Sequence, residues 1–279
     1  MNKIYLIILI TLSSLFANEN THKNTKTTPE FGIYITSLNE LNTKKGSFDV
    51  IFWTWFLYNN KDYHPHKTVD ITNLKSMQSF YELEAEEKEN IKDENSLSKI
   101  WQTQKFKTTI LHNWNLTEYP FDSHQLKIKF EDADFDYSQL TFTLDQENSK
   151  ISKDLKLDGW IIEKLELIER ENIMETTFGD PAIQGSHSSY SEVTAIISIT
   201  RDGLRSFINI FAPIYLAFFL SWLGYFIKEA YTMKMTLFLS SIFMLIGNKN
   251  IIDSTTPISS DITLLDKVQF RINTNNAKK

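Results

Sequence analysis

The sequence contains no cysteine, only 8 glycines and 6 prolines among 279 residues, and a net charge of -6. Without cysteine, the chain forms neither disulfides nor thiolate metal sites. It has no glycine-rich phosphate loop and no Gly-x-Ser-x-Gly motif, which argues against the enzyme classes built on them. The acidic balance argues against nucleic acid as a partner. Phenylalanine, in contrast, is abundant with 20 residues, which suits strands and membrane helices.

Residues 1–17 have the features of a secretory signal peptide. Lys3 precedes the apolar stretch Ile4–Leu12, and a short segment leads from there to Ala17, after which cleavage is expected. The apolar stretch is too short for a membrane anchor, which is the other interpretation of such a segment. Residues 18–30 are rich in Asn, Thr and Lys, and we expect them to form a linker.

Residues 31–201 have the pattern of a β-domain, in which β-branched and aromatic runs alternate with turn-forming segments. The charged segment Tyr81–Asn95 is expected to be a solvated loop or hairpin, and Gly179–Ser189 a hairpin tip. The spacing of the runs predicts a mainly β, immunoglobulin-like sandwich. The expected strands are Phe31–Leu41, Phe48–Tyr58, Lys99–His112, Leu126–Glu131, Leu140–Leu144, Ile161–Phe178 and Tyr190–Thr200.

The composition changes at Arg201, and residues 202–279 are expected to form a transmembrane α-helical domain. Phe207–Ile227 carries no charge and would extend about 31 Å as a helix, which is enough to cross the hydrocarbon core. Pro213 within it is tolerable where a neighbour satisfies the freed carbonyl. We expect a first membrane helix over 204–228 and a second over 233–253.

The second helix carries a stripe of polar and small residues. Steps of three and four keep these residues on one face, with a phenylalanine on the same line. Two interpretations remain open: small residues mediate packing against another helix, or the stripe lines an aqueous pore with the phenylalanine as a hydrophobic constriction. The stripe consists of Thr236, Ser240, Phe243, Gly247 and Asn250.

The segment His112–Leu126 contains Tyr119-Pro120-Phe121-Asp122 between two strand-like runs. Pro120 removes a backbone donor, and an aspartate such as Asp122 can cap a turn. The order aromatic, proline, phenylalanine, aspartate resembles the signature loop of the Cys-loop receptor, or pentameric ligand-gated ion channel, superfamily. His112 and Leu126 stand where the animal receptors have the two cysteines that close this loop, and bacterial members also lack that disulfide.

The order of parts is similar to that family over roughly residues 31–266. The resemblance implies a bacterial channel subunit in the inner membrane, with its N-terminal domain in the periplasm. It implies a homo-oligomer, expected to be a pentamer, embedded in the lipid bilayer and conducting ions. It further implies an agonist that is a small molecule or a proton, no enzymatic activity, and no cofactor or metal.

The resemblance also assigns roles to individual residues. Glu229, before the second helix, would form an acidic ring favouring cations, and the stripe would line the pore. The ligand would bind between subunits, although strand aromatics more often belong to a core than to a pocket. Ala133 stands where many receptors place a tryptophan, so a cation-π box is incomplete. The ligand-binding residues would be Trp53, Phe135, Phe178 and Tyr190. The coupling residues would be Tyr119, Pro120, Phe121, Asp122, Arg201 and Pro257, with Arg201 paired to an acidic group.

The family continues with two further membrane helices, and Thr263–Asp266 resembles the start of the third. Residues 267–279 are polar and cannot span a membrane. We therefore expect a chain truncated after the second membrane helix, with an incomplete remainder. This favours an alternative function, a membrane-tethered periplasmic ligand-binding module that does not conduct.

Other sites have weaker support in the sequence. Glu131 and the acids Asp132, Asp134 and Asp136 could supply paired carboxylates, but adjacent acids in a turn are usually solvated. Their spacing begins like a calcium loop, although Tyr137 stands where glycine is required and Thr143 where glutamate is required. His64 and His66 could bind a transition metal, but no third ligand is evident.

Overall fold

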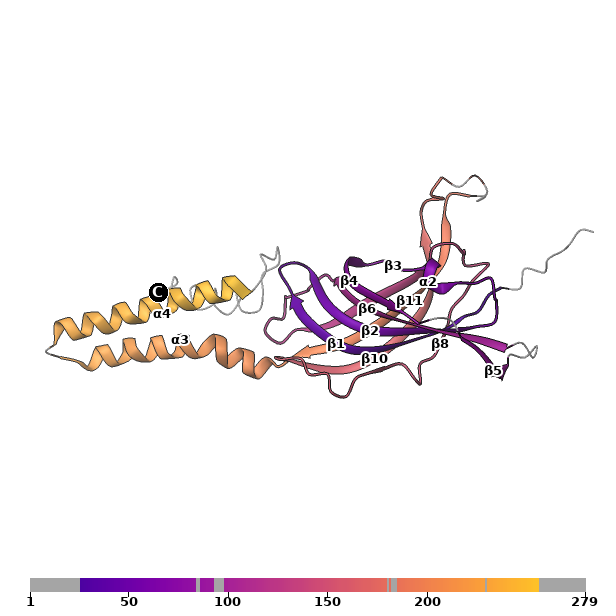
Figure 1. Cartoon of the computed structure of the whole chain (residues 1–279). Helices are drawn as coiled ribbons and strands as arrows, with labels where there is room; N and C mark the ends of the chain where they lie inside the picture. Colours follow the sequence, from indigo (N-terminus) through magenta and orange to yellow (C-terminus); the bar gives the residue numbers. More distant parts are fainter. Residues whose placement is uncertain are drawn as a thin grey trace, which may run out of the picture.

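The computed structural model describes residues 26–83, 86–92, 98–179, 181, 185–228 and 230–255. The expected signal peptide, Glu229, Pro257 and the polar residues 267–279 lie outside the described residues. Within them, a two-sheet β-domain is followed by a pair of long helices (Figure 1).

Seven strands of the described chain form one sheet and four form another. The first sheet follows the order β4-β6-β2-β1-β8, with β5 paired to β6 and β9 paired to β1, and the second follows β10-β11-β7-β3. The seven strands are β1 (Glu30–Asn42), β2 (Ser47–Tyr58), β4 (Leu74–Glu82), β5 (Glu86–Lys92), β6 (Ser98–Leu111), β8 (Thr143–Leu144) and β9 (Lys150–Ile151). The four are β3 (Val69–Ile71), β7 (Ser123–Asp132), β10 (Trp160–Met174) and β11 (Ser188–Arg201), and a short helix, α2 (Pro65–Thr68), precedes β3.

One apolar core joins the two sheets. In β2, residues buried from solvent alternate with half-buried ones, as expected of a strand with one face in a core. Phe31 of β1 and Phe130 of β7 bring the sheets together, with ring centroids 4.9 Å apart. Burying such aromatic side chains is worth roughly 1.5–3 kcal/mol each, so this layer is a main source of stability.

The mainly β architecture is confirmed, and the structure decides between the two alternatives, loop or hairpin, for one charged segment. The described part of Tyr81–Asn95 belongs to β4 and β5, both of which pair with β6. Strand pairing uses backbone groups, so a charged sequence can form an edge strand. Because β5 and β6 are consecutive strands that pair antiparallel, the hairpin alternative is confirmed for the described part of this segment, and the loop alternative is wrong.

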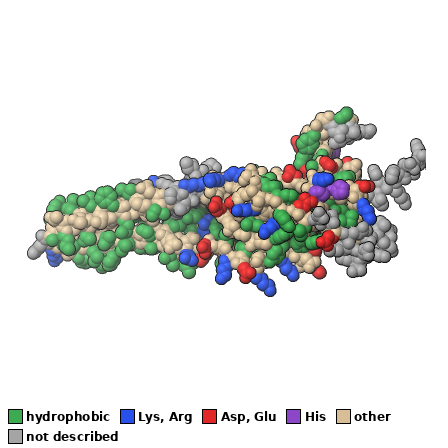
Figure 2. Space-filling view, viewed as in Figure 1, with side chains coloured by type: hydrophobic (Ala, Val, Ile, Leu, Met, Phe, Trp, Pro, Cys, Tyr) green, Lys and Arg blue, Asp and Glu red, His purple; other side chains and the backbone are tan. Residues whose placement is uncertain are grey.

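The helix pair consists of α3 (Gly203–Phe226) and α4 (Tyr231–Thr255). Asp202 caps α3, since its side chain accepts a hydrogen bond from the backbone of Arg205 at 3.3 Å. By length and composition, α3 is the one helix among the described residues that could cross a membrane, with a mean hydropathy of 1.7. Hydrophobic side chains cover much of the visible surface of the helix pair, whereas charged ones are spread over the β-domain (Figure 2).

The proline in α3 lies beside an interhelical hydrogen bond. Pro213 has no N–H, so the carbonyl group of residue 209 loses its usual partner in the helix. On the neighbouring carbonyl, the buried Asn248 of α4 donates to the oxygen of Ile210 at 3.0 Å. A second polar contact joins the hydroxyl groups of Ser221 and Ser241 at 2.8 Å. These bonds fix the two helices to each other along one face of α4.

Candidate functional site

The junction between the β-domain and α3 is built around Asp122. This carboxylate is 2% exposed and accepts hydrogen bonds from Arg201 Nε at 2.6 Å and Nη2 at 2.9 Å. The antiparallel register of β7 and β11 places Ser123 opposite Thr200, so the residues beside them meet at the end of the sheet. The Arg201 backbone N–H also donates to the Asp122 carbonyl at 3.0 Å. The sheet register therefore produces the pair.

A histidine completes the environment of this carboxylate. His124 Nε2 lies 2.7 Å from Asp122 Oδ2, and the carboxylate can only accept, so this nitrogen carries the hydrogen. Burial would raise the pKa of Asp122, but hydrogen bonds from His124 and Arg201 and the charge of Arg201 outweigh it and lower the pKa to about 2. The pair is therefore ionised at neutral pH.

Aromatic rings hold the guanidinium group of Arg201 in place. Its central carbon lies 4.0 Å from the ring centroid of Trp160 and 4.9 Å from that of Tyr119. Trp160 is the register partner of Arg201 in β10, and Tyr119 belongs to the predicted signature loop. Stacking against π faces favours a planar guanidinium group over a lysine ammonium. The site thus fixes both the charge and the orientation of Arg201.

His112, at the start of the segment His112–Leu126, belongs to a packed cluster of rings. His112 lies with ring centroids 4.6 Å from Trp114 and 5.8 Å from His124, while Leu126 is buried in the core. Among the described residues, neither His112 Nε2 nor Trp114 Nε1 has a hydrogen-bond partner. Burial, together with electrostatic repulsion from His124 and Lys127, lowers the pKa of His112 to about 4. His112 is therefore neutral at physiological pH.

The signature loop rests on the first turns of α3. The ring of Phe121 lies 6.1 Å from that of Phe207. A Cβ atom at Gly203 would come within 2.2 Å of Phe121 Cδ1, so only glycine allows the ring to lie on this backbone. Tyr119 packs against the small cluster of Ile210 and Phe211 further along the helix. The Tyr119–Pro120 peptide bond is cis. The loop thus contacts α3 directly, whereas its expected neighbour near Pro257 is outside the described residues.

The polar stripe of α4 faces away from α3. All five of its members, Thr236, Ser240, Phe243, Gly247 and Asn250, are exposed in the single chain. Phe243 is 70% exposed, while Ser241 and Asn248 on the opposite side are buried against α3. Packing between α3 and α4 therefore does not use the stripe. It leaves the stripe free for water or for a second copy, and pore lining stays a prediction.

The four aromatic residues assigned to a ligand pocket are not brought together in one chain. Trp53 lies half-buried on the outer face of the seven-stranded sheet, with Lys105 Nζ 5.2 Å above its ring and Tyr81 beside it. Phe178, which is 66% exposed, and Tyr190 belong to the β10–β11 hairpin of the other sheet. Phe135 packs edge-on against the buried Tyr63. A shared pocket would need a second subunit.

The acidic loop after β7 has a structural role. Asp132 accepts hydrogen bonds from Tyr63 Oη at 3.0 Å, from Thr68 Oγ1 at 2.7 Å and from two backbone N–H groups of its own loop. Burial and the charge of Asp132 raise the pKa of Tyr63. In the described parts of the chain, no group of three or more His, Asp or Glu side chains could hold a metal ion.

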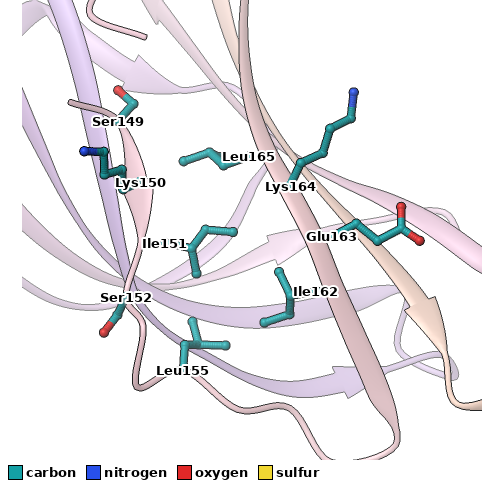
Figure 3. A pocket seen from close by; sticks show the side chains of 9 residues that line it. All are labelled: Ser149, Lys150, Ile151, Ser152, Leu155, Ile162, Glu163, Lys164 and Leu165. Carbon is teal, nitrogen blue, oxygen red and sulfur yellow. The ribbon is translucent and has the colours of Figure 1, made fainter. Parts of the chain in front are cut away.

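A cavity of about 410 Å³ lies apart from the predicted site residues, between β9 and the start of β10 (Figure 3). Ile151, Leu155, Ile162 and Leu165 point into it, and all four also pack against the core. Because β9 and β10 belong to different sheets, the cavity marks an opening between the sheets.

Several residues at the junction could not be recognised individually from the sequence. Trp160, Gly203 and Asn248 acquire their roles only through partners that lie far away in the chain or across the helix pair, whereas the partner of His124 is close in sequence. The one available signal was position: His124 is two residues beyond Asp122, on the same side of an alternating strand. Neither protein-family models nor curated proteins give a match to this chain.

Proposed function

We propose that this chain is a subunit of a bacterial ion channel of the pentameric ligand-gated type. Its β-domain, as an immunoglobulin-like sandwich in the periplasm, would bind the agonist between subunits. The helices α3 and α4 would lie in the inner membrane, and five copies of α4 would surround the pore.

One observation carries this proposal, the contact of the Tyr119–Asp122 loop with Arg201 and α3. A ligand can shift membrane helices only through a contact whose geometry differs between two states. The ion pair joins the loop to the last residue of β11, and the ring of Phe121 lies on Gly203. A movement of the sandwich would therefore reach α3 through both the backbone and the loop.

The helix pair supports the same proposal. The face of α4 that carries Phe243 is exposed in one chain and is not needed for packing on α3. In a ring of copies this face would turn inward, with Phe243 as the constriction that dewetting closes. The mostly exposed apolar side chains of α3 would then face lipid or neighbouring subunits.

The second candidate is a periplasmic ligand-binding module tethered to the membrane without conducting. It is favoured by the finding that α3 alone, among the described helices, is long and apolar enough to span. The two functions differ in whether α4 lines a pore, since both retain the β-domain and its ligand.

The test is to purify the full chain in detergent, measure its mass by light scattering corrected for detergent, and reconstitute it into vesicles for ion flux. A mass near five subunits together with flux supports the channel. A monomer without flux supports the tethered module. A pentamer without flux under every agonist and pH tried would leave assembly established but contradict conduction.

A further inference from the structure

Three carboxylates lie side by side on the outer face of the four-stranded sheet. The register pairs Asp70 of β3 with Glu131 of β7, and Glu131 with Glu192 of β11. Arg170 of β10 follows next to Glu192 in the same row. Like charges directly opposite each other destabilise a sheet, so this row requires compensation.

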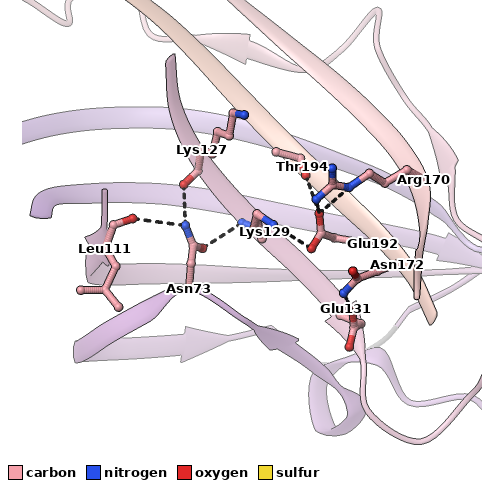
Figure 4. A network of polar contacts seen from close by, with 9 residues as sticks. All are labelled: Asn73, Leu111, Lys127, Lys129, Glu131, Arg170, Asn172, Glu192 and Thr194. Carbon is pink, nitrogen blue, oxygen red and sulfur yellow. Dashed lines mark hydrogen bonds and ion pairs between the residues drawn. The ribbon is translucent and has the colours of Figure 1, made fainter. Parts of the chain in front are cut away.

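The compensation is concentrated on Glu192, as Figure 4 shows. Glu192 is 1% exposed, and its Oε1 accepts from Arg170 Nε at 2.9 Å and Nη2 at 2.7 Å, and from Thr194 Oγ1 at 3.0 Å. Its Oε2 accepts from Lys129 Nζ at 3.1 Å. Burial would raise the pKa of Glu192, but these partners outweigh it and lower the pKa. Glu192 therefore stays ionised.

Glu131 is left with much less compensation. It is 8% exposed, and its Oε2 accepts one hydrogen bond, from the Asn172 amide at 2.8 Å. Both nearby cations, Lys129 and Arg170, are already bonded to Glu192, and among the described residues no cation is within ion-pair distance of Glu131. Burial and the charges of Glu192 and Asp70 raise the pKa of Glu131, against the opposing effects of Asn172 and Lys129.

We propose that Glu131, in its row with Asp70 and Glu192, is a proton-binding site that fills while Glu192 beside it stays ionised. Protonation forms one O–H bond on the Glu131 carboxylate with a proton from solvent. It removes one negative charge from the row Asp70–Glu131–Glu192 and turns an acceptor into a donor.

The hydrogen bond between Asn172 and Glu131 connects the protonation of Glu131 to the β10–β11 hairpin. Asn172 of β10 reaches across β11 to Glu131, and its register partner is Tyr190. The exposed Phe178 lies in the connection beyond these strands. Proton uptake therefore changes a contact at the base of the hairpin that carries Phe178 and Tyr190, two of the residues predicted to bind the ligand. The link between proton uptake by Glu131 and channel gating rests on the proposed function, whereas the proton uptake itself does not.

The first experiment is a titration of the intact chain in detergent by 13C NMR of the glutamate carboxyl carbons. The Glu131 signal is identified by its loss in Glu131→Gln. We expect its midpoint to lie above about 4.3, the value of an unperturbed glutamate, and that of Glu192 to lie below it. A Glu131 midpoint at or below about 4.3 would overturn the proposal. This measurement is made on the wild-type chain and needs no conduction.

The second experiment compares urea midpoints of wild type and Glu131→Gln from pH 7 to pH 4. Because the folded pKa is raised, the ionised carboxylate disfavours the folded state above that pKa, and the penalty disappears as the pH falls. Glutamine at position 131 keeps the oxygen that accepts from Asn172 but carries no charge. The urea midpoint of Glu131→Gln should therefore be higher than that of wild type at pH 7, and the difference between the two midpoints should shrink toward pH 4. The matched control is Glu166→Gln, which removes an exposed carboxylate from the same face of the sheet. A difference that is independent of pH would contradict the proposal.

Flux measurements then separate the two proposals. If Glu131 titrates as expected and flux changes with pH in wild type but not in Glu131→Gln, the proton site is linked to gating. If it titrates but flux does not respond to pH, the link to gating is overturned. If no flux occurs at any pH while Glu131 titrates, the proposed channel function fails and the proton site stands.

Discussion

Asp122 and Arg201 lie 79 positions apart in the sequence, and their side chains form two hydrogen bonds of 2.6 and 2.9 Å. The bidentate geometry suits the planar guanidinium group, and charge-assisted bonds of this kind are roughly twice as strong as neutral ones. Trp160 and Tyr119 shield Arg201 from water on its faces. The end of β11, the loop before β7 and the start of α3 are therefore held at one point.

Removing the charge of Asp122 should destabilise the β-domain strongly. Asp122→Asn leaves the guanidinium of Arg201, whose side chain is 15% exposed, without its counter-ion. Breaking a buried pair from one side costs about 3–5 kcal/mol. The measurement is the free energy of unfolding in urea at pH 7. Asp154→Asn, at an exposed position of the same domain, is the control and should change it by less than about 0.5 kcal/mol. Equal effects of the two variants would mean that the pair contributes no net stability.

The same pair predicts how stability depends on acid. The folded pKa of Asp122, about 2, lies below the value of about 3.9 for an unfolded aspartate. Its contribution, about 2–3 kcal/mol, is therefore complete above pH 4 and is lost as the pH falls toward 2. Unfolding free energies of wild type and Asp122→Asn, measured at several pH values, should converge by this amount. A gap that stays constant from pH 5 to pH 2 would contradict the low pKa.

The sequence was sufficient to predict the features that depend on local pattern. The β-branched and aromatic run Phe48–Tyr58 predicted β2, and the uncharged run after Arg201 predicted a long apolar helix that the structure places as α3. In contrast, the partner of Arg201 could be predicted only as an acidic group. Its identity depends on the register of β7 against β11, which no local pattern reports. Trp160 and Gly203 acquire their roles from the same long-range pairing.

The stripe on α4 is a feature that the sequence predicts only in part. Periodicity correctly predicts that Thr236, Ser240, Phe243, Gly247 and Asn250 share one face of the helix. It cannot say which face meets α3, because α4 is apolar on several sides. The structure decides this through Asn248 and Ser241, which bond to α3 on the opposite side.

If Phe243 is the constriction of a pore, a small polar replacement should keep that pore wet. Phe243→Ser is expected to raise the resting ion leak of reconstituted vesicles above that of wild type, because dewetting at an apolar ring closes such pores. Ile242→Ser is the matched control, since Ile242 is also exposed on α4 but lies about 100° around the helix from Phe243, off the stripe. Equal leak in the two variants would contradict a gate at Phe243 and favour the tethered module.

The contact between the Phe121 ring and the Gly203 backbone leads to a prediction that can be tested without ion conduction. Gly203→Ala would place a Cβ atom 2.2 Å from Phe121 Cδ1, so the ring must move away from α3. Overpacking of this kind typically costs about 1–3 kcal/mol of unfolding free energy. Phe121→Ala removes the obstacle, and the alanine at position 203 should then have little effect or even stabilise the helix start. The double-mutant cycle in urea should therefore show a coupling of about 1 kcal/mol or more between the two positions. Additive effects would mean that the loop does not rest on α3 in solution, and the proposed route from the sandwich to the membrane helices would lose its main contact.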